Sequence, residues 1–304
     1  MSRVERPLGA RPGTLCGHWW PTRRRWRHRG NLAWAVAFLI PYAAVFVAFV
    51  AYPVAYGVLM ASEPSLYREL ARDPRYAWTI VNTALFVVFG VNVQMFLALL
   101  LSGFFMRRGW WTKALLGVYL LPWALPSIPA FVSFHWMLIG EEGLVNRVLS
   151  VVFGVAGPIW FNDRWLALGS NIVAYIWKWM PFWTLTFLAG RLAIPQDIYE
   201  AAEVDGAGGG RRFVHVVLPL LGNLYLVSTL LATLWTIGDV TTVSLVSGGA
   251  PAYSTEVLAT LGFNYAFDAA SPSLGVAAVM SALPVLIPIG IALMRTAQTR
   301  DIQL

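Results

Sequence analysis

The sequence predicts an all-α, polytopic membrane protein with six transmembrane helices and with both termini in the cytoplasm. Hydrophobic residues make up 58% of its 304 residues and charged residues only 12%, where a soluble domain carries roughly 25% charged residues. The hydrophobic residues gather in runs long enough to cross a bilayer as helices. The net charge of +7 comes from basic residues that bracket these runs, a pattern that sets membrane topology and does not indicate nucleic-acid binding.

Six apolar runs each meet or exceed the roughly 20 residues that a transmembrane helix needs. They cover residues 32–60, 78–105, 114–139, 166–190, 219–246 and 273–294. Several runs contain proline. Because neighbouring helices can satisfy the backbone groups that a proline frees, we expect kinks in these spans rather than breaks.

The basic residues orient the spans. Sixteen of the 22 Lys and Arg residues lie in the N-terminal tail, in 106–113, in 191–218 and in the C-terminal tail, whereas five lie on the other side and Lys178 lies inside a span. The positive-inside rule therefore places both termini and the 191–218 loop in the cytoplasm.

Two domains follow from this topology: a basic cytoplasmic tail over 1–30, expected to be disordered, and a six-span domain over 31–304. The apolar run after TRRRWRHRG (22–30) is too long for a cleaved signal peptide, so we expect an uncleaved anchor. On the outer side, 141–165 has apolar residues at helical spacing and predicts an interfacial helix. These residues are Leu144, Val148, Val151 and Val152.

Several kinds of chemistry are missing from the sequence. Cys16 is the only cysteine, so no intrachain disulfide can form. No GxxxxGK[ST] motif is present, which excludes nucleotide binding through a P-loop. The four histidines show no metal-ligand spacing, and no Ser/His/Asp arrangement can be argued. We therefore expect no metal, no cofactor and no catalytic site in this chain.

A polar loop over 195–219 separates the fourth and fifth spans. Pro195 is expected to begin a short helix and the run Gly206–Gly210 to end it. Acidic residues lie near the positive end of the helix dipole, namely Asp197, Glu200 and Glu203. Small residues would allow close contact with another protein, namely Ala201, Ala202 and Ala207. The alternative is a solvated connector, which most charged loops are.

The residue order favours the first interpretation, because EAAxxDGAxxxxxFxxVxLP resembles the coupling-loop signature of ABC-importer permeases. The matching residues are Glu200, Ala201, Ala202, Asp205, Gly206, Ala207, Phe213, Val216, Leu218 and Pro219. The preceding IPQDIYEAA (194–202) is similar to the lead-in of the same family. Residues 234–267 resemble the fifth span and outer loop of sugar permeases of the maltose and glycerol-phosphate type, and SLGVAAVMSAL (273–283) resembles the start of their last span.

The resemblance implies one half of a transmembrane pair in the bacterial inner membrane. Its partners would be a second permease subunit in a heterodimer, two copies of a cytoplasmic ATPase that bind the ATP, and an extracytoplasmic solute-binding protein. The ATPase would receive the loop helix, with Glu200 and Glu203 facing its basic residues, Gly206 reversing the chain and Pro219 restarting the fifth span. The coupling residues would be Glu200, Ala201, Ala202, Glu203, Asp205, Gly206, Ala207 and Phe213.

The chain departs from the family pattern at two places. Gly208–Gly210 stands where relatives carry a bulky residue near the last position, which predicts a more flexible turn and weaker coupling. Asn223 stands where many members carry proline.

Two ionisable residues lie inside predicted spans, Asp239 and Lys178, and such residues are functional candidates because burying them is costly. The alternative is neutralisation by a neighbouring span. Aromatic residues surround them, and aromatic faces stack well on sugar rings, although tryptophans also form interfacial belts. By resemblance to the maltose permease, the residues matching a sugar-lined path are Trp179, Phe182, Trp235, Thr236 and Asp239, with Pro181 kinking the fourth span.

The leading hypothesis is thus a permease subunit of an importer for a sugar or related polyol. One alternative keeps this machinery for glycerol phosphate or another small polar solute. A second is an ion-coupled secondary transporter with Asp239 and Lys178 as a proton relay, against which the loop signature argues. A membrane-embedded enzyme lacks any catalytic constellation.

Overall fold

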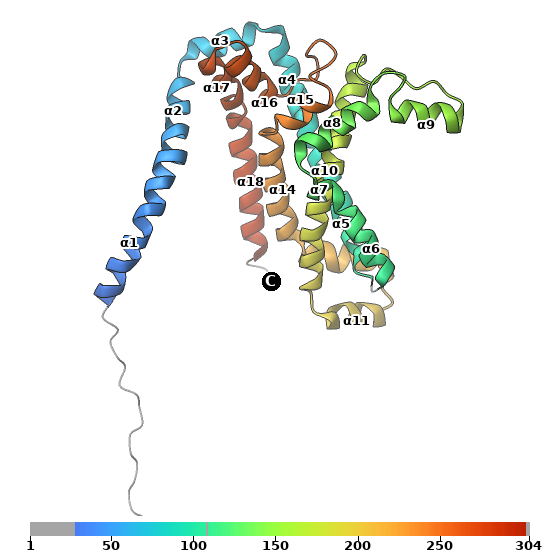
Figure 1. The fold of residues 1–304 in the computed structure, drawn as a ribbon. Helices are drawn as coiled ribbons and strands as arrows, with labels where there is room; N and C mark the ends of the chain where they lie inside the picture. The colour runs from blue at the N-terminus through green and yellow to red at the C-terminus, as the bar shows by residue number, and fades with distance from the viewer. Residues whose placement is uncertain (1–27, 108, 302–304) are drawn as a thin grey trace, which may run out of the picture. The chain divides into compact units, whose positions relative to one another are not determined.

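The computed structural model describes residues 28–107 and 109–301, and these residues form helices and connecting turns without any strand (Figure 1). The chain divides into two units, Met1–Val54 and Ala55–Leu304. The predicted disordered tail falls outside the described residues except at 28–30, which begin the first helix.

The first unit consists of α1 (His28–Phe46), the π-helical segment η1 (Val47–Ala51) and the start of α2 (Tyr52–Met60). Pro41 lies inside α1 without ending it. The stretch Val36–Met60 is long and apolar enough to cross a membrane, and none of its residues is buried. A helix that is apolar on all sides is typical of a membrane span.

The core of the second unit is built on two long helices. One is formed by α4 (Pro74–Leu85), η2 (Phe86–Val91) and α5 (Asn92–Phe105), and the other is α10 (Arg164–Leu192). The two lie side by side along α5 and α10 (Figure 1). Their shared core is apolar, and close side-chain packing is what holds helices together in a bilayer. Its buried members include Met95, Leu99, Trp183 and Phe187.

The C-terminal helices complete this unit. α14 (Gly222–Ile237) packs against α18 (Leu283–Asp301), while α16 (Leu258–Phe263) and η4 (Asn264–Asp268) pack against α17 (Pro272–Met280), which also contacts α3 (Pro64–Arg72). Gly262 and Gly275 allow α16 and α17 to approach closely. A Cβ built on Gly262 would lie 2.9 Å from the Gly275 carbonyl oxygen, so larger residues would push the helices apart.

The structure differs from the six predicted spans at two of them, the third and the fifth. Among the described residues, three helices are long and apolar enough to cross a membrane, or up to five if each bent pair counts as one span. The 29 residues of α10 are long enough but less apolar. Segment 141–165, predicted to hold an interfacial helix, contains the helix α9 (Leu144–Phe153).

The expectation that prolines would only kink the spans is wrong for the third span. α6 (Trp110–Tyr119) and α7 (Leu121–Ala124) meet α8 (Ser127–Leu138) at 96°. Pro126 supplies no backbone N–H, and it adopts an extended conformation that cannot continue a helix. The chain therefore turns sharply between α7 and α8.

The predicted fifth span, 219–246, is not one helix. Helical turns begin at Gly209 with α12 (Gly209–Arg212), η3 (Phe213–Val217) and α13 (Leu218–Leu220), and a 71° bend at Leu221 separates them from α14. Pro219 therefore lies in the first turn of α13, where proline is tolerated, and does not restart the span. After α14 the helix stops again, and α15 (Thr241–Val246) follows.

The break between α7 and α8 exposes carbonyl groups, and the Lys178 side chain binds them. Its Nζ donates to the Pro122 oxygen at 2.8 Å, to the Trp123 oxygen at 3.2 Å and to the Leu125 oxygen. The side chain is only 2% exposed. A cation at a helix C-terminus is favourable, so Lys178 holds the bent third span against α10.

Lys178→Met is expected to lower the free energy of unfolding by about 1–3 kcal/mol, because it leaves buried carbonyl groups without donors. The measurement is thermal or denaturant unfolding of the purified protein in mild detergent. The matched control is Lys113→Met, which removes an exposed lysine on α6. Equal stability of the two variants would rule out the bracing role of Lys178.

Candidate functional site

The polar loop contains the helix that the sequence predicts, α11 (Gln196–Val204), preceded by Pro195. Its C-terminus is closed by a Schellman motif: the Gly206 N–H donates to the Glu203 oxygen at 3.0 Å and the Ala207 N–H to the Ala202 oxygen at 2.9 Å. Gly206 has a φ of +75°, a backbone conformation that favours glycine. The predicted left-handed turn at Gly206 is confirmed.

Most of the predicted coupling residues lie on the surface of this loop. The exposed members are Glu200, Ala201, Glu203, Asp205 and Gly206, and the half-buried members are Ala202, Ala207 and Phe213. Glu203 lies 3.7 Å from Arg212, an exposed ion pair of small energetic value. Val204 is an apolar residue with 88% of its surface exposed. α11 therefore offers an acidic face with an exposed apolar residue at its end.

The other face of the loop is attached to the helical core. Ile194, Tyr199 and Phe213 pack against the cluster that contains Met95, Leu99 and Phe187. The loop follows directly from the end of α10, so α11 lies across the end of that helix (Figure 1). Side-chain packing thus connects the polar loop to α5 and α10.

Arg191, in the last turn of α10, strengthens this attachment. Its Nε donates to the Ser102 Oγ at 2.7 Å and its Nη2 to the Leu99 oxygen at 2.9 Å, both on α5. Its guanidinium also faces the Phe213 ring at 5.7 Å. Gly103 leaves room for it, since a Cβ there would lie 3.3 Å from the guanidinium. The one signal for this role in the sequence is a basic residue at the boundary between an apolar run and the polar loop.

The three glycines that follow α11, Gly208–Gly210, do not form the flexible turn that the sequence predicts. Gly208 caps α12, and Gly209 and Gly210 form its first turn. A Cβ added at any of the three would meet nothing within 4 Å. The reason is that the Schellman motif has already reversed the chain at Gly206, so the following residues are free to start a helix.

The predicted aromatic residues of the fourth and fifth spans come together. Trp235 of α14 lies 6.1 Å from Trp179, 5.6 Å from Phe182 and 5.4 Å from Trp183, measured between ring centroids. Trp123, beside the break in the third span, lies 5.8 Å from Phe182. Trp235 is 47% exposed. The cluster therefore presents aromatic surface outside the packed core.

The polar residues predicted beside this cluster have structural partners. The Thr236 hydroxyl bonds the Tyr175 hydroxyl at 2.8 Å and donates to the Ala232 oxygen at 2.7 Å. Asp239 lies in the break between α14 and α15, where its Oδ1 accepts from the Thr241 N–H at 2.9 Å and its Oδ2 from the Thr242 hydroxyl. Asp239 thus caps α15, as Asp commonly does at a helix N-terminus.

A polar network fixes the end of the unit opposite α11. The Asn82 Nδ2 donates to the oxygens of Ser254 and Glu256, each at 2.8 Å, and its Oδ1 accepts from the Arg164 Nη2 at 2.7 Å. The Arg164 Nε also donates to the Ser254 oxygen at 3.2 Å. These bonds attach the loop after α15 to both α4 and α10. The sequence analysis did not identify this network.

Charged groups continue the network. Arg75 donates to Asp73 through Nη2 at 2.9 Å and lies 3.9 Å from the Glu256 Oε2. Although burial acts in the opposite direction, hydrogen bonds from Arg75 and Tyr265 hold the pKa of Asp73 below its ordinary value. Burial, with the hydrogen bond to Asp73, raises the pKa of Tyr265 to about 12. No group of three His, Cys, Asp or Glu side chains that could hold a metal ion occurs in the described part of the chain.

The fold and the loop define a multi-pass, all-α membrane protein with a capped polar helix attached to its core. The family model described as "Binding-protein-dependent transport system inner membrane component" matches residues 94–298, more than half of the chain. The chain belongs to this family, and the resemblance that its loop signature indicates is confirmed.

Curated relatives support the same assignment. The chain is 34% identical over 256 residues to the sulfoquinovosyl glycerol transport system permease protein SmoG of Agrobacterium fabrum, covering 79% of this chain and 82% of that protein. It is 34% identical over 189 residues to the trehalose/maltose transport system permease protein MalF of Thermococcus litoralis, covering 62% and 61%. With MalF of Escherichia coli the identity is 29% over 235 residues, covering 74% of this chain but 45% of that protein.

Two solved structures share the fold. One is a bacterial ABC transporter involved in the import of the acidic polysaccharide alginate, with a TM-score of 0.75 at 20% identity, covering 90% of this chain and 98% of that chain. The other is a bacterial alginate ABC transporter in complex with its alginate pentasaccharide-bound periplasmic protein, with a TM-score of 0.74 at 21% identity, covering 89% and 96%. At these identities the likeness shows the fold alone.

Gly206→Ala is expected to weaken the Schellman turn, because a left-handed conformation costs a residue with a Cβ about 1–2 kcal/mol. Amide hydrogen exchange at residues 206 and 207 should accelerate by roughly 5- to 30-fold. The matched control is Gly210→Ala, whose helical backbone accepts alanine and whose Cβ meets open space. Similar exchange in both variants would contradict the role of Gly206.

Proposed function

We propose that this chain is a transmembrane permease subunit of an ATP-driven importer and forms half of the translocation path for a sugar or related polyol. The observation that carries the proposal is the capped helix α11, in a chain that belongs to the family of binding-protein-dependent transport components. The chain itself is a non-catalytic subunit and holds no cofactor. ATP is bound by its partners.

The proposed partners are a second permease subunit, two copies of a cytoplasmic ATPase and an extracytoplasmic solute-binding protein. The second permease subunit, in a heterodimer, and the ATPase are proposed because the chain belongs to this family of transport components. The alginate transporter with a similar fold was solved with its periplasmic protein, which supports a solute-binding partner here. Mass spectrometry of the complex purified in mild detergent tests all three, and purification without any nucleotide-binding subunit would contradict the proposal.

The proposed topology has six spans in the bacterial inner membrane, with both termini and α11 in the cytoplasm and 1–30 as a basic tail. α10 supplies the span predicted over 166–190, and it packs against α5. The distribution of Lys and Arg supports this orientation.

In the proposed mechanism the ATPase receives α11 through its exposed acidic face. Residues Glu200, Ala201, Ala202, Glu203, Asp205, Gly206, Ala207 and Phe213 form or support this docking surface. Closure of the ATPase dimer on ATP moves α11 as a rigid body, because the Schellman turn fixes one end and packing of Tyr199 and Phe213 fixes the other face. Arg191 passes the movement to α5, which tilts the spans for alternating access.

The proposed solute path includes the aromatic cluster of Trp179, Phe182 and Trp235, with Thr236, Asp239 and Lys178 supporting its walls. Aromatic faces stack on the C–H faces of sugar rings. The names of the relatives, which include trehalose, maltose and a sulfoquinovosyl glycerol, support a sugar or glycoside as solute. Glycerol phosphate or another small polar solute is the alternative within the same machinery.

The geometry gives less support to a secondary transporter with a proton relay. The Lys178 ammonium donates to three carbonyl oxygens, and the Asp239 carboxylate caps α15. Both groups are thereby committed to fixed partners, and a relay needs groups that can exchange protons with each other.

Glu200→Lys is expected to abolish solute uptake in a reconstituted transporter, because it reverses a charge at the center of the proposed docking face. The protein should remain in the membrane at a normal level, since Glu200 is exposed and lies outside the core. The control is Glu142→Lys, the same reversal in the turn before α9. Normal uptake by Glu200→Lys would exclude the coupling role of α11.

Trp235→Ala is expected to raise the KM for uptake by roughly tenfold, since it removes stacking surface worth about 1.4 kcal/mol. The measurement is uptake of labelled solute across a concentration series. Trp110→Ala is the control, because Trp110 is an exposed tryptophan at the start of α6, away from the cluster. An equal rise of KM in both variants would indicate a general effect on the membrane protein and would contradict a solute path at Trp235.

A further inference from the structure

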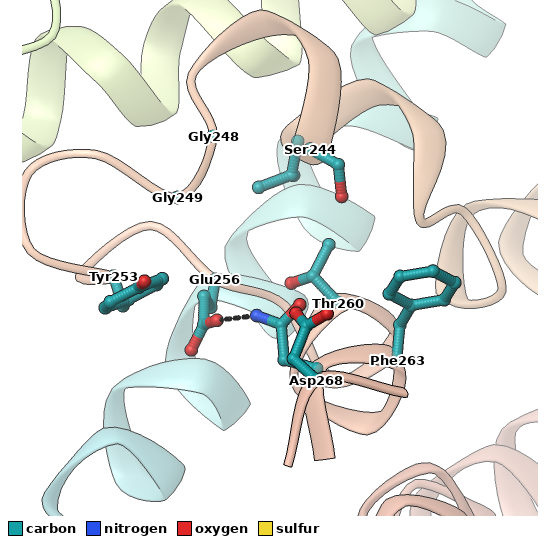
Figure 2. A pocket seen from close by; sticks show the side chains of 10 residues that line it. Ser244, Gly248, Gly249, Tyr253, Glu256, Thr260, Phe263 and Asp268 are labelled. Carbon is teal, nitrogen blue, oxygen red and sulfur yellow. Dashed lines mark hydrogen bonds between the residues drawn. The ribbon is translucent and has the colours of Figure 1, made fainter. Parts of the chain in front are cut away.

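A cavity of about 310 Å³ lies among α15, the loop after it, α16 and η4. Figure 2 shows the aromatic side chains of Tyr253 and Phe263 on opposite sides, with the carboxyl groups of Glu256 and Asp268 between them. The elements around it lie at the end of the second unit opposite α11 (Figure 1). In the proposed orientation this is the outer face of the membrane.

Glu256 carries the argument, because its side chain is only 1% exposed and yet incompletely bonded. Its Oε1 accepts from the Asn264 Nδ2, drawn as a dashed line in Figure 2. Its Oε2 accepts no hydrogen bond, and the nearest cation, Arg75, lies 3.9 Å away. Arg75 is itself engaged by Asp73. A buried carboxylate oxygen without a hydrogen-bond donor is costly, so a ligand hydroxyl that reached the Glu256 carboxylate from the cavity would stabilise it.

The remaining lining of the cavity suits a neutral, hydroxyl-bearing ring. Asp268 is an exposed carboxylate at its mouth and Ser244 an exposed hydroxyl on its opposite side. The Tyr253 and Phe263 rings are 55% and 44% exposed, which leaves aromatic faces free for stacking. Carboxylates that accept from hydroxyl groups between aromatic walls are the chemistry that binds carbohydrate.

The cavity and the aromatic cluster are neighbours along the chain. Ser244 belongs to α15, the helix that Asp239 caps, and Asp239 follows Trp235 by one turn.

We propose that this cavity is an outer subsite that binds a neutral sugar ring before it reaches the aromatic cluster of the membrane path. The proposal rests on the proposed function of the chain as a sugar-importer subunit. Glu256 accepts a hydrogen bond from a sugar hydroxyl, Asp268 accepts a second one at the mouth, and Tyr253 and Phe263 enclose the ring.

The test is protection of a cysteine placed in the cavity. Ser244→Cys is made in a full-length protein whose only cysteine, Cys16, is replaced by serine, and the assembled transporter is labelled with a membrane-impermeant thiol reagent. The probes are neutral mono- and disaccharides including maltose and trehalose, added without the solute-binding protein. Ser65→Cys, exposed on α3 and outside the cavity, is the control.

Labelling of Ser244→Cys should slow roughly fivefold at a sugar concentration a few times above Kd, since the reagent reacts only with the empty cavity. Labelling of Ser65→Cys should not change. Glu256→Gln keeps the shape of the side chain but weakens the acceptor, so the sugar concentration for half protection should rise by about tenfold.

Parallel uptake measurements separate this inference from the proposed function. A sugar that is accumulated but gives no protection overturns the subsite and leaves the importer assignment intact. Protection by the solute-binding protein but not by sugar, or equal protection by a polyamine such as spermidine, also overturns it, in favour of a docking surface or a cation site. If no sugar is accumulated, the proposed sugar import fails and the subsite fails with it.

Discussion

Side chains that satisfy broken backbone hydrogen bonds hold this membrane domain together, because the bilayer core offers no water to do so. Two predicted spans are interrupted, at 96° in the third and 71° in the fifth. Lys178 donates to the carbonyl groups at the break in the third span. Asp239 accepts from the Thr241 N–H at the start of α15, after α14 has ended. The charges that the sequence marks as costly are thus part of what allows helices to bend and leave aromatic surface between them.

The same principle operates at the loop. Arg191 is a buried cation that donates to a hydroxyl and a carbonyl group of α5, so it bonds the end of α10 directly to α5. The Schellman turn keeps α11 a stiff element, because both of its characteristic hydrogen bonds are made. A stiff helix on an interlocked pair is the arrangement that the proposed coupling requires, since a flexible loop would absorb the movement of the ATPase before it reached the spans.

The sequence predicts those features that depend on local pattern. The long helices, the start of α11 at Pro195 and the left-handed turn at Gly206 follow from apolar length, proline and glycine. The breaks do not, since the bend at Pro126 is stabilised by Lys178, which lies 56 residues from Pro122 in the chain. The polar network cannot be predicted from local sequence pattern, because Asn82 bonds Glu256 across 174 residues of the chain. The prediction of a flexible turn at Gly208–Gly210 is wrong for a related reason. The Schellman motif at Gly206 has already reversed the chain, so the glycines that follow can start a helix.

α10 connects the two ends of the second unit as one uninterrupted helix of 29 residues, roughly 43 Å long. At its start Arg164 is bonded to Asn82 and to the loop that forms the cavity wall, and at its end Arg191 is bonded to α5 beside the polar loop. Solute at the outer cavity and an ATPase at α11 would thus both contact elements that are bonded to this one helix. In the proposed importer, the outer subsite and α11 are therefore joined through one helix, and any coupling between the two sites would have to act in both directions.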